Sequence, residues 1–181
     1  NWPRTNMGFA DAGWLQASAT TIYRLDVSAN NGAAYWCIEE LSFYDSAGNR
    51  VGTEAGTASA QTETSANYAA SMAFNEVSDD DASYYCSQNG QTTGWLQYSF
   101  PASVDVASYK VERLNGIGDQ FSPVAWTLEE STDGESSWTQ LDEQSGQTDW
   151  GDGEIRQFTI QAGSASICKK LVLQSPGRCT S

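Results

Sequence analysis

The segment 126–138 constrains the fold more than any other part of this chain of 181 residues. Apolar and polar side chains alternate from Trp126 to Ser131, with the period of a β-strand that turns one face toward a core. Asp133-Gly134 follows, and this dipeptide readily adopts the positive φ angles of a tight hairpin turn. The chain then returns as a second strand that places Trp138 and Leu141 for burial. The segment therefore predicts a β-hairpin with two tryptophan anchors.

Other segments show the alternation or the apolar enrichment of strands. They are 22–28, 35–44, 95–100, 106–114, 155–160 and 168–174, with 50–66 as an edge strand or a loop and 68–74 as a short helical turn. About eight strands in a chain of this length fit a jelly-roll β-sandwich, so we expect one all-β domain over residues 1–181. Residues 1–21 lack this alternation and are predicted to form an irregular N-terminal arm.

The charge balance excludes several classes of partner. The chain has 23 acidic and 9 basic residues, which gives a net charge of −14. Nucleic acids and anionic membranes are bound by basic surfaces, so neither is an expected partner. The acidity can serve solubility in salty surroundings or the local binding of cations, and both readings stay open. The sequence contains no apolar run of about 18 residues, the length that would predict a transmembrane helix, and no signal peptide is visible.

Histidine is absent, which excludes the usual Ser-His-Asp and Cys-His nucleophile systems. No acidic residue lies in a recognisable motif for hydrolysis by paired carboxylates, so we expect no enzymatic activity. The four cysteines contain no C-x-x-C pair, which argues against zinc. An even number of cysteines in an acidic all-β chain favours disulfides and an extracellular setting. Three pairings are possible, and four free thiols in a reducing compartment are the alternative.

Segment 126–141 resembles a known signature. It has seven positions of the discoidin pattern in order, namely Trp126, Leu128, Ser131, Asp133, Gly134, Trp138 and Leu141. Discoidin domains are also called coagulation-factor type C domains and are close kin of the family-32 carbohydrate-binding modules. The resemblance implies a jelly-roll sandwich of the galactose-binding-domain type, with binding loops at one end.

The resemblance extends to segment 23–45, which is similar to the "Y-R … N-N-G … I-x-E-L" segment of many microbial discoidin-like modules. That segment normally closes the module, whereas here it precedes the hairpin. The chain therefore resembles a circular permutation of the family fold. Permutation is tolerated in sandwiches because their termini lie at the surface and often close together.

Segment 73–85 resembles the calcium loop of this family, A-F-D-G-x-x-x-T-x-W. Asn75 stands where the family has Asp, Ser83 where it has Thr, and Glu40 matches a later Glu that closes the site. Glu76 replaces the family's Gly and about three residues are inserted, so Asp80 or Asp81 can serve as substitute carboxylates. The resemblance thus implies a structural calcium, an ion that prefers six to eight oxygen ligands. A solvated acidic loop is the alternative.

The same alignment implies the disulfide pairing. If Glu40 reaches the loop that ends at Tyr85, then Cys37 and Cys86 are neighbours in space. Cys168 and Cys179 would then close a short terminal hairpin.

The resemblance also places ligand loops at the calcium end of the sandwich. Candidate ligand-binding residues there are Tyr35, Trp36, Arg113, Asn115, Asp119 and Gln120. Arg113 is the expected polar anchor, and either aromatic ring can instead belong to the core. These residues predict a non-catalytic extracellular module that binds glycans or glycoproteins. The alternative is a structural or decoration subunit of a virion, tail or surface filament, which would contact copies of itself or other subunits through Trp2, Trp14 or the C-terminal segment.

Overall fold

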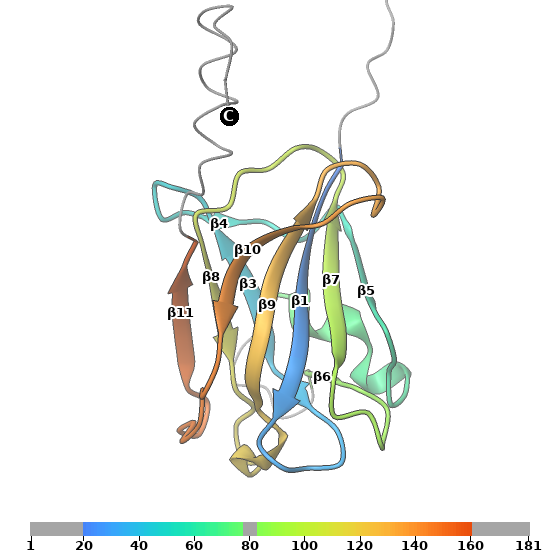
Figure 1. Ribbon diagram of the computed structural model, residues 1–181, viewed down its shortest axis with the longest axis vertical. Coiled ribbons are helices and arrows are strands. Elements are labelled where there is room, and N and C mark those ends of the chain that lie inside the picture. The colour runs from blue at the N-terminus through green and yellow to red at the C-terminus, as the bar shows by residue number, and fades with distance from the viewer. Residues whose placement is uncertain (1–19, 78–82, 161–181) are drawn as a thin grey trace, which may run out of the picture.

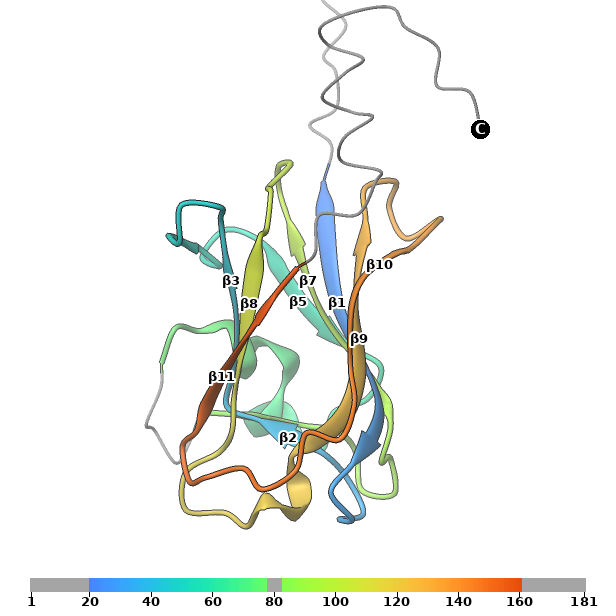
Figure 2. The same cartoon turned by 60° about the vertical axis from the view of Figure 1, so that its left-hand side comes forward.

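Two antiparallel sheets lie face to face in the computed structural model, which describes residues 20–77 and 83–160 (Figures 1 and 2). The five-stranded sheet has the order β10-β9-β1-β7-β5, with β1 Thr21–Asn30, β5 Thr57–Ala60, β7 Gly94–Phe100, β9 Pro123–Ser131 and β10 Thr139–Gln144. The four-stranded sheet has the order β11-β8-β3-β4, with β3 Glu40–Tyr44, β4 Arg50–Val51, β8 Ser108–Glu112 and β11 Ile155–Thr159. The predicted all-β sandwich is confirmed.

Shorter elements complete the described fold. Two strands of two residues, β2 Cys37–Ile38 and β6 Tyr85–Cys86, pair with each other. The helical turn predicted over 68–74 consists of two 3-10 helices, η1 Ala66–Tyr68 and η2 Ala70–Phe74, and a third is η3 Asp119–Phe121. Thr21, the last residue of the predicted N-terminal arm, is instead buried in β1, and residues 1–19 of that arm lie outside the described residues. The strand predicted over 168–174 also lies outside them.

The alternation read from the sequence places the core. Alternate residues of β1, β7, β9, β3 and β8 turn inward and are at most 2% exposed; they include Tyr23, Leu25, Phe43, Leu96, Tyr98, Tyr109, Trp126 and Leu128. Their rings lie at distances that suit aromatic pairs, since the ring centroid of Phe43 is 5.3 Å from that of Tyr23 and 5.9 Å from that of Phe100. Burial of these rings is the main contribution to the stability of the sandwich.

The predicted hairpin between β9 and β10 forms, but segment 132–138 connects the strands in place of a tight turn at Asp133-Gly134, and Trp138 is not a core anchor. Gly134 and Glu135 have φ angles of 69° and 71° at the turn. Trp138 precedes β10 and lies half-buried on the outer face of the five-stranded sheet, where the guanidinium of Arg24 is 3.7 Å from its ring centroid. The same guanidinium is 4.6 Å from the ring of Trp95. A cation between two rings replaces burial in the core as the interaction that holds Trp138.

Loops gather at the two ends of the sandwich. Segments 31–36, 87–93, 113–122 and 145–154 lie at one end, which is at the bottom of Figure 1 and is here called the loop end. Segments 45–49, 101–107 and 132–138 lie at the opposite end. In the described part of the chain, no helix is long and apolar enough to cross a membrane.

Candidate functional site

A disulfide joins Cys37 and Cys86 across the β2–β6 pair, as the resemblance implied. The two cysteines are direct partners in an antiparallel register, and both are buried. The loops on either side of this pair are held to it, since the backbone N–H of Ser87 donates to the carbonyl of Trp36 at 3.0 Å. The bond therefore fixes segments that are 49 residues apart in sequence. The other expected disulfide, Cys168–Cys179, lies outside the described residues.

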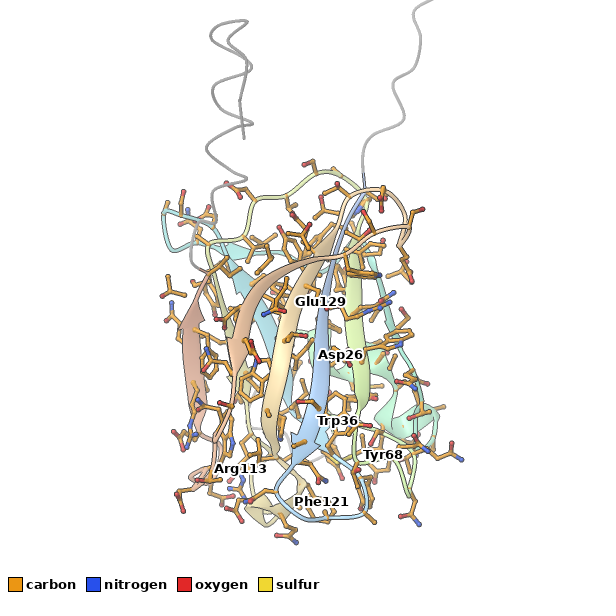
Figure 3. All side chains as sticks on the ribbon, in the orientation of Figure 1. Asp26, Trp36, Tyr68, Arg113, Phe121 and Glu129 are labelled. Atoms are coloured by element: carbon orange, nitrogen blue, oxygen red, sulfur yellow. A yellow bond between two sulfur atoms is a disulfide. The ribbon has the colours of Figure 1, made fainter. Side chains whose placement is uncertain are left out.

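The disulfide lies within a second apolar cluster at the loop end, separate from the core between the sheets. Its buried members are Cys37, Cys86 and Leu114, and the partly buried side chains packed against them are Tyr35, Tyr68, Tyr84, Ile117 and Phe121. Figure 3 places Tyr68 and Phe121 at this end of the molecule. We call this set the loop-end cluster. Its aromatic rings are only partly covered, which leaves apolar surface open to a ligand.

The aromatic rings of the loop-end cluster form two pairs. The centroids of Tyr35 and Phe121 are 4.8 Å apart and their planes are tilted by 41°. Tyr68 and Tyr84 are also 4.8 Å apart and are stacked, with an interplanar angle of 29°. Each pair fixes the orientation of its two rings, so the exposed ring faces are pre-formed.

Hydrogen bonds hold segments 31–36 and 113–122 to each other. The amide of Asn30 donates to the carbonyls of Ala33 and Tyr35 at 2.9 and 2.8 Å. The N–H of Ala33 donates to the carbonyl of Gln120 at 3.0 Å. Asn31 donates from Nδ2 to Oδ2 of Asp119, also at 3.0 Å. Polar side chains and the Tyr35–Phe121 pair are thus arranged together on linked loops.

Four of the predicted ligand-binding residues lie at the surface of the loop end. Tyr35, Asn115 and Asp119 are half-buried and Gln120 is exposed. The N–H of Asn115 donates to Oε2 of the buried Glu39 at 3.2 Å, which leaves its side-chain amide for other partners. These residues surround the Tyr35–Phe121 pair through their shared loops. Whether they contact a ligand stays a prediction.

Arg113 has a different environment from the one expected of a ligand anchor. Its side chain is only 7% exposed, and Nη1 donates to Oδ1 of Asp152 at 2.7 Å. The same oxygen accepts the N–H of Gly116 at 2.8 Å. Arg113 therefore holds segments 113–122 and 145–154 together from below the surface.

Trp36 is fully buried, and its ring is not open to a ligand in this structure. The ring packs edge-on against Tyr85 at 5.0 Å, and the backbone N–H of Trp36 donates to Oγ of Ser87 at 3.1 Å. The prediction that Trp36 contacts a ligand is therefore wrong for this conformation. The pairing of β2 with β6 turns Trp36 into the core and leaves its neighbour Tyr35 at the surface.

Sequence reasoning missed Tyr68, Tyr84 and Ile117 as members of this site. Phe121 directly follows Gln120, so its proximity was readable from the sequence. Tyr68 and Tyr84 meet only because the disulfide brings the end of segment 62–86 back to β2. No local spacing predicts that contact.

The residues proposed to bind calcium lie in one neighbourhood as far as they are described. Asn75 donates from its amide to Oγ of Ser83. Glu40 forms an ion pair with Arg50, whose Nε is 3.6 Å from Oε1 of Glu76, the residue after Asn75. Asp80 and Asp81 lie outside the described residues. Among residues 20–77 and 83–160, no group of three or more His, Cys, Asp or Glu side chains could hold a metal ion.

The negative charge of the Glu40 carboxylate is only partly compensated by its surroundings. Its side chain is 3% exposed, and burial raises its pKa to about 8 although the adjacent Arg50 guanidinium lowers it. Its Oε2 atom accepts no hydrogen bond from the described part of the chain. Glu112 lies directly opposite on β8 and raises the pKa further by charge repulsion. The electrostatics at this position favour a proton or an additional cation.

Comparisons of this chain with protein-family models, with curated proteins and with solved structures found no match.

Proposed function

We propose that this chain is a non-catalytic glycan-binding module and that the loop-end cluster is its ligand-binding surface. One observation carries the proposal: partly covered aromatic rings, held in fixed pairs, lie beside surface amide and carboxylate groups on linked loops. Sugars have apolar C–H faces that pack on aromatic rings and hydroxyl groups that hydrogen-bond to planar polar side chains. Binding sites for small ligands combine these two features.

Calcium is the proposed cofactor, with a structural role. Glu40, Asn75 and Ser83 supply oxygen ligands, and Asp80 and Asp81 are further candidates. The raised pKa of Glu40 supports the proposal, and so does its Oε2 atom, which accepts no hydrogen bond from residues 20–77 or 83–160, because a divalent cation would compensate a carboxylate that Arg50 compensates only in part. Asn75 replaces the aspartate of the calcium loop, so we expect weaker binding than in a loop with that carboxylate.

An extracellular location is proposed from the Cys37–Cys86 disulfide, because such bonds persist in oxidising compartments. The expected partners are glycans or glycoproteins. Nucleic acids and anionic membranes are not proposed partners of a chain with a net charge of −14.

A glycan array with the oxidised chain in the presence of Ca²⁺ tests the proposed function. Hits should be lost in Phe121→Ala, which removes one ring of the loop-end cluster. The matched control is Tyr44→Ala, which removes a half-buried ring at the opposite end of the sandwich and should keep the hits. An array without hits, or one that responds equally to both variants, would contradict the proposal. Arg113→Ala is a poorer probe because Arg113 supports the loops from within.

The calcium proposal has its own test. EDTA should lower the melting temperature and added Ca²⁺ should restore it, because a ligand that binds only the folded state stabilises it by mass action. Asn75→Ala should abolish the response. A melting temperature that is insensitive to both EDTA and Ca²⁺ would rule out the site.

A subunit of a larger assembly is the second candidate function. Ile155 favours it, because this residue is 51% exposed on β11, a strand with only one partner, β8, among the described strands. Light scattering should then show multimers that Ile155→Lys disperses. A monomer at all concentrations would remove this candidate.

A further inference from the structure

The geometry of the disulfide indicates how the two aromatic pairs of the loop-end cluster are spaced. Tyr35 lies two residues before Cys37, and Tyr84 lies two residues before Cys86. In an antiparallel pair, residues that precede the two partners extend in opposite directions. Tyr35 and Tyr84 therefore precede the cysteine pair in opposite directions, and both pack against the cluster that contains it.

Each of these tyrosines pairs with a second ring, since Phe121 lies beside Tyr35 and Tyr68 lies beside Tyr84. All four rings pack against the one cluster that contains the disulfide and Leu114. Two separate ring pairs in one cluster offer more aromatic surface than a single sugar ring can cover.

The charges of the loop end decide which sugars it accepts. Its described arginines are already engaged: Arg113 is paired with Asp152, and Arg156 donates to Glu154 at 2.8 Å and lies 4.0 Å from the ring of Trp150. The side chain of Asp152 is 59% exposed. Asp149 is exposed and Asp119 is half-buried at the same end. An anionic sugar would therefore meet carboxylates here, and the described residues of the loop end offer it no arginine that is free of a carboxylate partner.

We propose that the loop end binds an uncharged oligosaccharide that spans both aromatic pairs, one sugar on Tyr35–Phe121 and another on Tyr68–Tyr84. This inference rests on the proposed glycan-binding function and deepens it. The Cys37–Cys86 disulfide acts as the spacer between the two subsites. Affinity then depends on chain length, because a single sugar reaches only one pair.

Calorimetry with uncharged homo-oligosaccharides of glucose, mannose, galactose and N-acetylglucosamine, from one to six units, tests the proposal. At least one series should bind more tightly as it lengthens, until both pairs are occupied. Tyr68→Ala should weaken the longer sugars about 3- to 10-fold, the value of one aromatic contact, and leave the monosaccharide unchanged. Tyr68→Leu, which retains apolar packing, should show the same loss. Sialylated or sulfated forms of the bound sugar should bind more weakly, and more so at low salt.

The outcomes separate this inference from the function on which it rests. Two results would overturn the two-subsite arrangement and leave glycan binding intact. One is a monosaccharide that binds as tightly as its oligomers. The other is a Tyr68→Ala variant that has the melting temperature of the native chain and retains full affinity for the longest sugar. Tighter binding of the anionic forms would overturn the charge selectivity. If no sugar in any series binds, the proposed function itself fails. Tyr44→Ala is the control for unspecific effects of removing a surface ring.

Discussion

The core between the sheets and the loop-end cluster are both built from aromatic rings, but their order has different origins. Core rings such as Phe43 and Phe100 are at most 2% exposed, and burial against other rings fixes them. Tyr35 and Phe121 keep part of their surface open, and a covalent bond and loop hydrogen bonds fix their surroundings. Stability is therefore concentrated between the sheets, and the loop end is free to present apolar surface that a hydrophobic core would have to cover. The predictions below test this separation.

Truncation of the core should have the largest effect. Phe43 is fully buried and contacts the rings of Tyr23, Phe74 and Phe100. Phe43→Ala should lower the free energy of unfolding by about 3 to 5 kcal/mol, the usual cost of a cavity of this size. Urea denaturation followed by circular dichroism measures the change. A loss below about 1 kcal/mol would mean that the core does not carry the stability of the sandwich.

Removal of the disulfide should cost less and act more locally. The double variant Cys37→Ser/Cys86→Ser should lose about 2 to 4 kcal/mol, because the bond closes a long loop in the unfolded chain. Hydrogen exchange should show early loss of protection in segments 31–36 and 113–122, while amides of β1 and β9 stay protected. Equal loss of protection in both regions would show that the two clusters form one cooperative unit.

The stability should fall as the pH rises, because of Glu40. Its pKa is about 8 in the folded chain against an ordinary value of 4.5, so the folded state holds a proton that the unfolded state releases. The contribution is complete below the unfolded value and is lost as the pH approaches 8. In EDTA, the melting temperature should therefore decline between pH 5 and 8, and Glu40→Gln should flatten the decline. An unchanged decline in the variant would assign it to another group.

Phe121→Ala tests the same comparison between core and loop end by removing a ring of the loop-end cluster. Its ring contacts Tyr35 and is partly exposed, so we expect a loss of only about 1 kcal/mol in the free energy of unfolding. Sugar binding should nevertheless disappear. Denaturation and calorimetry on the same preparation give both values. A variant that unfolds early but still binds sugar would reverse the assignment of roles.

The smallest effect is expected at the opposite end, in the β9–β10 hairpin. Asp133 accepts hydrogen bonds from Ser131 and from both the backbone and the side chain of Ser137, which lowers its pKa to about 2. Its contribution is present above pH 3.8 and is lost as the pH falls toward 2. Asp133→Asn should therefore reduce the dependence of the melting temperature on pH in this range. Neither the disulfide region nor sugar binding should respond.

Much of the fold was predictable because it follows from the local alternation of apolar and polar residues. The inward residues of β1, β7 and β9 follow a period of two, and Asp133-Gly134 marks the reversal between β9 and β10, although segment 132–138 makes that connection longer than the predicted tight turn. The Cys37–Cys86 pair came from the resemblance to discoidin domains. Trp138 shows the limit, since alternation alone did not indicate that Arg24 would hold it outside the core.

The site was less predictable because its contacts join distant segments. Tyr35 and Trp36 are adjacent aromatic residues, and only the register of β2 against β6 decides which of them faces inward. Arg113 has the sequence position of a ligand anchor, but Asp152, 39 residues away, determines its role. Tyr68 and Tyr84 become neighbours through the same long-range closure.

The β2–β6 bond has a practical consequence for anyone who prepares this chain. Expression in a reducing cytosol would give material with intact sheets and normal circular dichroism, but with the Tyr35 and Tyr84 surfaces no longer held at a fixed distance. Such material would fail in binding screens because of how it was made. Oxidative refolding in a glutathione redox buffer, with mass spectrometry to confirm the loss of two hydrogen atoms from the linked Cys37–Cys86 peptides, is therefore the first quality check before any assay.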